Sequence, residues 1–146
     1  MFFRSIVITS AFATTLFLAA CYQVPQSTAA SNVKGSISAG PQAAGGSITV
    51  SEVAMPSNGW LVVHAVRDGK MDVSGSIGHT YVPAGPSSDV AVSLTEAVAP
   101  GDSVVAMLHL DTGNAKVYEF ANGSTEPQDM PVFIDGKPVM ASIQLN

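Results

Sequence analysis

Apolar residues recur in short runs along most of the chain, and clusters of turn-forming residues separate these runs. From Ser47 onward the runs have strand length, are rich in Val, Ile, Leu and aromatic residues, and follow one another about every ten residues. The gaps hold Gly, Asn and Pro, which favour turns because Gly and Asn accept positive φ and Pro fixes φ at about −65°. No 3.6-residue period is evident, so the pattern predicts an all-β domain at 47–146, an antiparallel sandwich of about seven to eight strands. The expected strands are Ile48–Val53, Trp60–Val66, Met71–Ile77, Asp89–Glu96, Ser103–Leu110, Lys116–Phe120 and Val139–Leu145.

Three of these runs indicate which residues form the interior. The fourth run alternates, which places Val90, Val92 and Leu94 on one face, and we expect this face to meet the core. Trp60–Val66 and Val104–Leu110 are apolar at consecutive positions, which is typical of central strands covered on both faces. We therefore expect Trp60, the only tryptophan, to be buried.

The two ends of the predicted domain differ in character. Near the C-terminus, Val132-Phe133-Ile134 followed by Asp135-Gly136 and Val139 predicts a terminal hairpin. Ahead of the domain, 21–46 is rich in Gln, Ser, Ala, Gly and Pro, and this composition predicts a flexible tether. The alternative for part of this segment is a short edge strand at Val33–Ser38, where residues alternate weakly.

An apolar segment precedes the tether. Arg4 is followed by about 15 uncharged residues, Ile6 to Ala20, fewer than the roughly 20 that a membrane-spanning helix needs. A short basic start, an apolar stretch and small residues at its end predict a signal peptide at 1–20. An uncleaved anchor and a plain secretory signal are the alternatives.

Leu18-Ala19-Ala20-Cys21 closes this segment and resembles a bacterial lipobox. The resemblance implies that a diacylglyceryl group is attached to Cys21, that 1–20 is removed, and that the mature protein begins with the lipidated cysteine. The expected location is the cell envelope, where the protein would be lipid-anchored and extracytoplasmic, facing the periplasm or the cell surface.

Cysteine content and charge narrow the possible functions. Cys21 is the only cysteine, so once it carries lipid the chain has no thiol for a disulfide or a thiolate metal site. The chain holds 11 acidic against 6 basic side chains, and loss of Arg4 with the signal peptide leaves a net charge of about −6. Such a domain is repelled by nucleic acid, which we exclude as a partner.

Four strings, taken together and in order, resemble a known family. They are Gly59-Trp60-Leu61-Val62-Val63-His64, Ile77-Gly78-His79, Ala106-Met107-Leu108-His109-Leu110-Asp111 and Val117-Tyr118-Glu119-Phe120. In this order they resemble an uncharacterised domain family of prokaryotic cell-surface proteins, a domain of unknown function, over Ser47 to Leu145. The resemblance implies an immunoglobulin-like β-sandwich and implies no reaction.

Motifs for catalysis are lacking in the sequence. It has no P-loop, no G-x-G-x-x-G between a strand and a helix, and no G-x-S-x-G elbow. We therefore expect a protein that is not an enzyme and that needs no cofactor.

The three histidines are the strongest candidates for chemistry, because all of them fall inside the family-like strings. His64 and His109 lie toward the ends of two predicted central strands, and Met107 shares a face with His109 that Asp111 continues. Together with His79 they could form a zinc or copper site, with neutral imidazole as donor and Met107 as a soft ligand for Cu(I). Blue copper is excluded, since that centre needs a Cys thiolate. The interpretation that we favour is structural: His64 and His109 hydrogen-bond to turn backbone, and Met107 belongs to the core.

Asp111-Thr112-Gly113-Asn114, with Glu119 beyond it, invites comparison with a calcium loop. Calcium loops gather several carboxylates at alternate positions, whereas this segment has one. An Asx-turn capped by Asp111 is the interpretation that we favour.

The sequence thus predicts a lipid-anchored β-sandwich that acts as a non-catalytic binding or structural module of the cell envelope. Its expected partners are the membrane, through the N-terminal lipid, and an envelope protein or glycan of unknown identity. The alternative function is a periplasmic copper- or zinc-handling protein that uses the clustered histidines.

Overall fold

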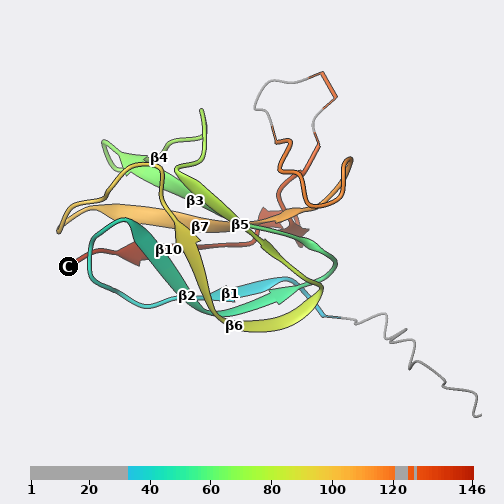
Figure 1. The fold of residues 1–146 in the computed structure, drawn as a ribbon, viewed down its shortest axis with the longest axis horizontal. Coiled ribbons are helices and arrows are strands. Elements are labelled where there is room, and N and C mark those ends of the chain that lie inside the picture. Colours follow the sequence, from blue (N-terminus) through green and yellow to red (C-terminus); the bar gives the residue numbers. More distant parts are fainter. Residues whose placement is uncertain (1–32, 121–124, 127) are drawn as a thin grey trace, which may run out of the picture.

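The computed structural model describes residues 33–120, 125–126 and 128–146 (Figure 1). Over these ranges the regular structure is entirely β. The strands are β1 (Ser36–Ser38), β2 (Ser47–Met55), β3 (Gly59–Arg67), β4 (Lys70–Met71), β5 (Gly78–Val82), β6 (Gly85–Ser93), β7 (Ser103–Leu110), β8 (Phe133–Ile134), β9 (Lys137–Pro138) and β10 (Met140–Gln144). The described ranges contain no helix able to cross a membrane.

Two antiparallel sheets form the layers of a β-sandwich. One sheet has the order β1-β2-β6, and the other has the order β10-β7-β3-β4, with β5 also paired to β3. Figure 1 shows β1, β2 and β6 beneath the larger sheet, and β8 and β9 as a separate small hairpin. The predicted β-sandwich is therefore confirmed. The ten strands exceed the predicted seven or eight because the list of expected strands lacked β1, β5 and the two short strands of the terminal hairpin, β8 and β9.

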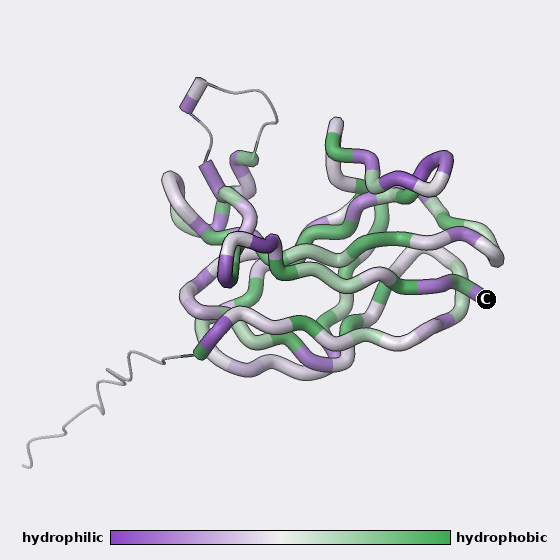
Figure 2. Tube along the Cα trace, turned by 180° about the vertical axis from the view of Figure 1, so that it is seen from behind, coloured by the Kyte–Doolittle hydropathy of each residue, from purple (hydrophilic) through white to green (hydrophobic). Residues whose placement is uncertain are grey.

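An aliphatic core fills the space between the two sheets. Successive strand residues point to opposite faces, so alternate positions of β3 (Leu61, Val63 and Ala65) enter this core. On β7 the corresponding positions are Val104, Ala106 and Leu108. The buried cluster consists of Ile, Val, Leu, Ala and Met side chains. Figure 2 shows hydrophobic positions concentrated along the strands and hydrophilic ones in the connecting loops.

The predictions for the central strands, the alternating run and the hairpin are confirmed. β3 lies between β7 on one side and β4 and β5 on the other, and β7 lies between β3 and β10. In the alternating run Val92 is fully buried, while Val90 and Leu94 are partly buried and pack against the core. β8 pairs with β9 across Asp135-Gly136.

The predicted tether is wrong for residues 33–46. β1 pairs with β2, with Ile37 opposite Val53, so the alternative of a short edge strand is the correct one. Further along, the backbone of Gln42 bonds to Gln144, and its side chain bonds to the backbone of Thr49 at 2.8 and 2.9 Å. These are backbone pairings that composition does not reveal. The predicted signal peptide, Cys21 and the rest of the tether lie outside the described residues.

Two predicted strands are also wrong. Of the Met71–Ile77 run only Met71 lies in a strand, because Asp72 Oδ1 accepts hydrogen bonds from the backbone N–H and the hydroxyl of Ser74 and turns the chain. The run meets β3 again at Ile77, whose N–H donates to the Val63 carbonyl at 2.8 Å. The next strand, β5, was missed because its Gly-His-Thr-Tyr sequence lacks an aliphatic run. Lys116–Phe120 is a loop, in which Lys116 has a positive φ of 61°.

Candidate functional site

The face of the larger sheet that points away from the core carries the histidine and methionine side chains that could bind a metal or another ligand. The positions of β3 and β7 that alternate with the core residues bring Trp60 and His64, and Met107 and His109, to this outer face. Trp60 lies opposite His109 in the β3–β7 register, and His64 lies opposite Val105. All four side chains are at least 94% buried, which requires a cover over this face. The sandwich therefore has a second packed layer outside its core.

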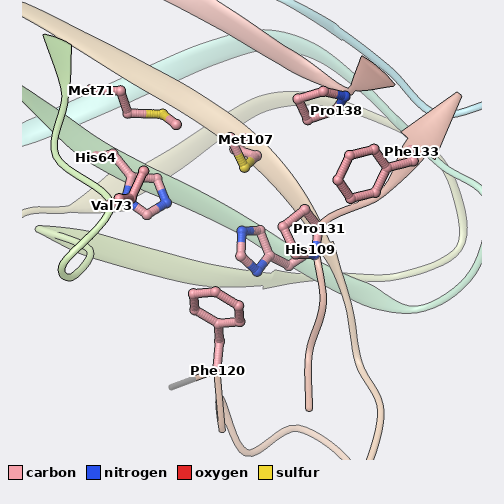
Figure 3. A pocket seen from close by; sticks show the side chains of 9 residues that line it. All are labelled: His64, Met71, Val73, Met107, His109, Phe120, Pro131, Phe133 and Pro138. Atoms are coloured by element: carbon pink, nitrogen blue, oxygen red, sulfur yellow. The ribbon is translucent and has the colours of Figure 1, made fainter. Parts of the chain in front are cut away.

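A pocket of about 200 Å³ opens between this face and its cover (Figure 3). Among the described residues that line it, the only side chains with nitrogen or sulfur donor atoms are two imidazoles and two thioethers. The others are Val, Phe and Pro. The lining residues are His64, Met71, Val73, Met107, His109, Phe120, Pro131, Phe133 and Pro138. Apart from the imidazoles, no titratable side chain of the described residues lines the pocket.

His109 is 1% exposed, and its orientation is defined by one hydrogen bond. Its Nδ1 lies 2.7 Å from the carbonyl oxygen of Asp129. A carbonyl oxygen only accepts, so Nδ1 carries the proton and Nε2 keeps a free lone pair. This Nε2 is buried without a hydrogen-bond partner. The pKa of His109 is lowered to about 4, mainly by burial and also by the nearby His64, while the hydrogen bond to the Asp129 carbonyl and the charge of Asp129 partly oppose the shift.

His64 is held in the same way from the other side of the pocket. Its Nδ1 lies 3.1 Å from the Asp72 carbonyl oxygen and 3.0 Å from that of Gly75, so this nitrogen is also the protonated one. The centroids of the two imidazole rings are 6.2 Å apart, with 30° between their planes. Both rings therefore use Nδ1 to bond loop backbone and leave Nε2 as an acceptor.

Asp129 organises the loop that covers the site, and the sequence analysis missed it. It is fully buried, with its Oδ1 accepting the backbone N–H of Thr112 and its Oδ2 that of Glu119, both at 2.7 Å. Its own N–H donates to Thr112 Oγ1 at 2.8 Å. A buried carboxylate with charge-assisted bonds to two backbone amides ties the two ends of this loop together. No pattern signal distinguishes Asp129, since it follows Pro127-Gln128 in a polar stretch.

The structure brings together three of the five predicted metal candidates. His64, Met107 and His109 line the pocket, whereas His79 and Asp111 do not. Met71, which sequence analysis treated only as a strand residue, joins them. The described residues contain no group of three or more His, Cys, Asp or Glu placed to hold a metal ion. Any metal here would therefore need the methionines.

His79 belongs instead to an aromatic cluster beside the pocket. Its ring stacks on Tyr118 at 4.4 Å and meets the edge of Trp60 at 5.5 Å, and burial lowers its pKa. Trp60 also contacts Tyr81 and Tyr118 at 5.6 and 5.5 Å. Trp60 is 6% exposed, so its predicted burial is confirmed, but it packs in this outer cluster and not between the sheets. Burial, reinforced by the charge of Asp129, raises the pKa of Tyr118.

Asp111 and Glu119 stabilise the loop after β7. The Asp111 carboxylate accepts the backbone N–H of Lys116, with N–O distances of 3.0 and 3.2 Å. Glu119 accepts the backbone N–H of Asn114 at 2.7 Å and its side-chain amide at 2.8 Å. The predicted Asx-turn is wrong in detail, because the Asp111 bond reaches five residues along the chain and an Asx-turn reaches two. These carboxylates hold backbone and do not converge as calcium ligands would.

One comparison with known proteins identifies a family. A family model described as "Domain of unknown function (DUF7282)" matches residues 35–146. The match starts ahead of β1, earlier than the resemblance seen in the sequence, and covers all ten strands of the described residues. No curated protein and no solved structure matches the chain.

Proposed function

The chain belongs to the DUF7282 family, whose description assigns no function, and we propose that it is a non-catalytic binding or structural module of the cell envelope, anchored by a lipid on Cys21. The observation that carries the binding role is the apolar pocket on the outer sheet face, covered by long loops and lined by no hydroxyl, thiol or carboxylate side chain of the described residues. Such a pocket offers a seat for a ligand but no hydroxyl or thiol nucleophile, and the Nδ1 protons of its two imidazoles are held in hydrogen bonds to backbone carbonyls. The partner of the anchored domain is a protein or a glycan of the cell envelope.

The anchor is tested by replacing its only possible attachment point. We expect the full-length chain, expressed in a bacterium, to sediment with membranes, and the Cys21→Ala chain to be released, because acyl chains contribute about 0.8 kcal/mol per buried methylene. Ser27→Ala, in the same segment, serves as the matched control and should stay with membranes. Membrane retention of a processed but unacylated Cys21→Ala chain would contradict the anchor.

Metal handling is the second candidate function, and one observation favours it. The two buried imidazoles both keep Nε2 as an acceptor beside the same pocket, and His109 Nε2 lacks a hydrogen-bond partner. An orphaned buried acceptor is uncommon in folded proteins and calls for an explanation. A bound copper or zinc ion would supply one. The test is the copper and zinc content of protein purified under mild conditions, compared with that of His109→Gln. Equal metal content in both would count against this candidate.

A further inference from the structure

The separation of the two imidazoles discriminates between coordination geometries. A metal–nitrogen bond of about 2.0 Å plus about 1.2 Å from nitrogen to ring centroid puts each centroid about 3.2 Å from a shared ion. A linear N–metal–N arrangement then separates the centroids by about 6.4 Å, and a tetrahedral angle separates them by about 5.2 Å. The observed 6.2 Å corresponds to an angle of about 150°, which is too wide for a regular tetrahedral zinc site and suits two imidazoles across one ion with further donors approaching from the side. Figure 3 shows the two rings on opposite sides of one space, each with a nitrogen directed into it.

Thioether sulfur completes the set of donor atoms. Met107 precedes His109 by two residues on β7 and therefore shares its face, and Met71 approaches from β4, across β3. Figure 3 shows the Met107 sulfur beside the space between the imidazoles and the Met71 side chain above the His64 ring, directed toward Met107. Thioethers bind Cu(I) and are poor ligands for Zn(II), Ca²⁺ or Mg²⁺.

Charge and burial agree with a monovalent ion. The lining residues supply no carboxylate to neutralise a divalent ion, and a buried charge without an opposite partner is costly. The orientation of both rings is already set, because Nδ1 of each is held by backbone carbonyls. Metal-ligating histidines in proteins are oriented by such bonds.

We propose that the pocket is a Cu(I) site whose ligands are Nε2 of His64, Nε2 of His109, and the sulfurs of Met107 and Met71. The proposal rests on the metal-handling candidate and specifies its metal. The apolar mouth of the pocket, where Val73 is 54% and Phe133 is 55% exposed, keeps bulk water from competing while leaving a path for the ion.

The test uses the full chain carrying Cys21→Ala, so that the only thiol is absent. Titration with Cu(I) under anaerobic conditions, against a chromogenic Cu(I) chelator, should give one ion per chain. X-ray absorption of that complex should show both nitrogen and sulfur neighbours. Met107→Leu and Met71→Leu conserve volume and should each weaken Cu(I) binding about tenfold or more, whereas His109→Gln and His64→Gln should abolish most of it.

Two substitutions outside the pocket serve as matched controls. Met130→Leu, at an exposed methionine, and His79→Gln, at an exposed histidine, should leave Cu(I) affinity unchanged. Cu(I) binding that is equally strong in the Met107, Met71 and histidine variants would overturn the proposal. One zinc ion bound in preference to Cu(I) would overturn it while leaving metal handling intact. Binding of neither metal would reject both.

Discussion

The inner and outer faces of β3 and β7 carry different kinds of side chain. Toward the other sheet, β3 and β7 present only aliphatic side chains, and these form a continuous core with side chains of β2 and β6. On the opposite face the same strands present Trp60, His64, Met107 and His109. These residues are as well buried as the core, yet they are covered by loops and a short hairpin.

The two faces differ in how well their buried polar groups are satisfied by hydrogen bonds. The inner face contains no side-chain hydrogen-bonding group, so it gains stability from every buried methylene and leaves nothing unsatisfied. The outer face buries three polar or charged residues, His64, His109 and Asp129, and leaves Nε2 of His109 and Nε1 of Trp60 without partners. Such costs are characteristic of sites that bind something.

The largest expected effect lies on the inner face. Leu61→Ala removes a fully buried side chain from the centre of β3 and should lower the free energy of unfolding by about 3 to 5 kcal/mol. Urea unfolding followed by circular dichroism measures the loss. A cost below about 1.5 kcal/mol would mean that the inner face is not the main source of stability.

On the outer face, Asp129→Asn should lower the free energy of unfolding by about 2 to 3 kcal/mol, because an amide NH₂ would replace an oxygen that now accepts a backbone N–H. Asn tolerates the positive φ of 49° at this position, so the backbone itself should not be strained. Loosening this loop should also shift Trp60 emission to longer wavelength, since Tyr118 covers Trp60. Unchanged emission together with unchanged stability would show that the loop does not depend on this carboxylate.

Acid should weaken the outer face selectively in the metal-free protein. The pKa of His109 is about 4 in the folded state and about 6.5 in an unfolded chain, so the unfolded state takes up the proton first. Stability is therefore intact above pH 7 and falls as the pH drops from about 6.5 toward 4. Between pH 7 and pH 5 this amounts to roughly 2 kcal/mol. Urea unfolding at both pH values should show the loss in the natural sequence and not in His109→Gln, and equal losses in both would refute it.

The smallest effect should come from Met107→Leu, a volume-conserving change at a pocket residue that should cost less than about 1.5 kcal/mol. Thermal unfolding without metal gives the cost. The contrast with Leu61→Ala tests whether Leu61 on the inner face serves stability while Met107 on the outer face serves binding. A loss as large as that of Leu61→Ala would show that Met107 is a core residue in the ordinary sense.

Period-two patterning was enough to predict the sandwich and its two central strands, because the inner face of each strand is aliphatic over its whole length. It also offered the edge strand at Val33–Ser38, where composition had predicted a tether. It failed at Met71–Ile77 and at Lys116–Phe120, where hydrogen bonds from side chains to the backbone decide the path of the chain.

The sequence by itself determined that the chain forms a β-sandwich, that it has one cysteine at the end of an apolar segment, and that all three histidines fall in the family-like strings. The tertiary structure alone decided which of these side chains meet. It places Met71 in the same pocket as His64 and His109, and it places His79 and Asp111 outside that pocket. The carbonyl of Asp129, 20 residues from His109 in the sequence, holds the Nδ1 proton of His109 and leaves its Nε2 as the free nitrogen. The physical reason is that strand faces follow from local alternation, whereas the loops that cover them are placed by long-range hydrogen bonds, which have no period to detect.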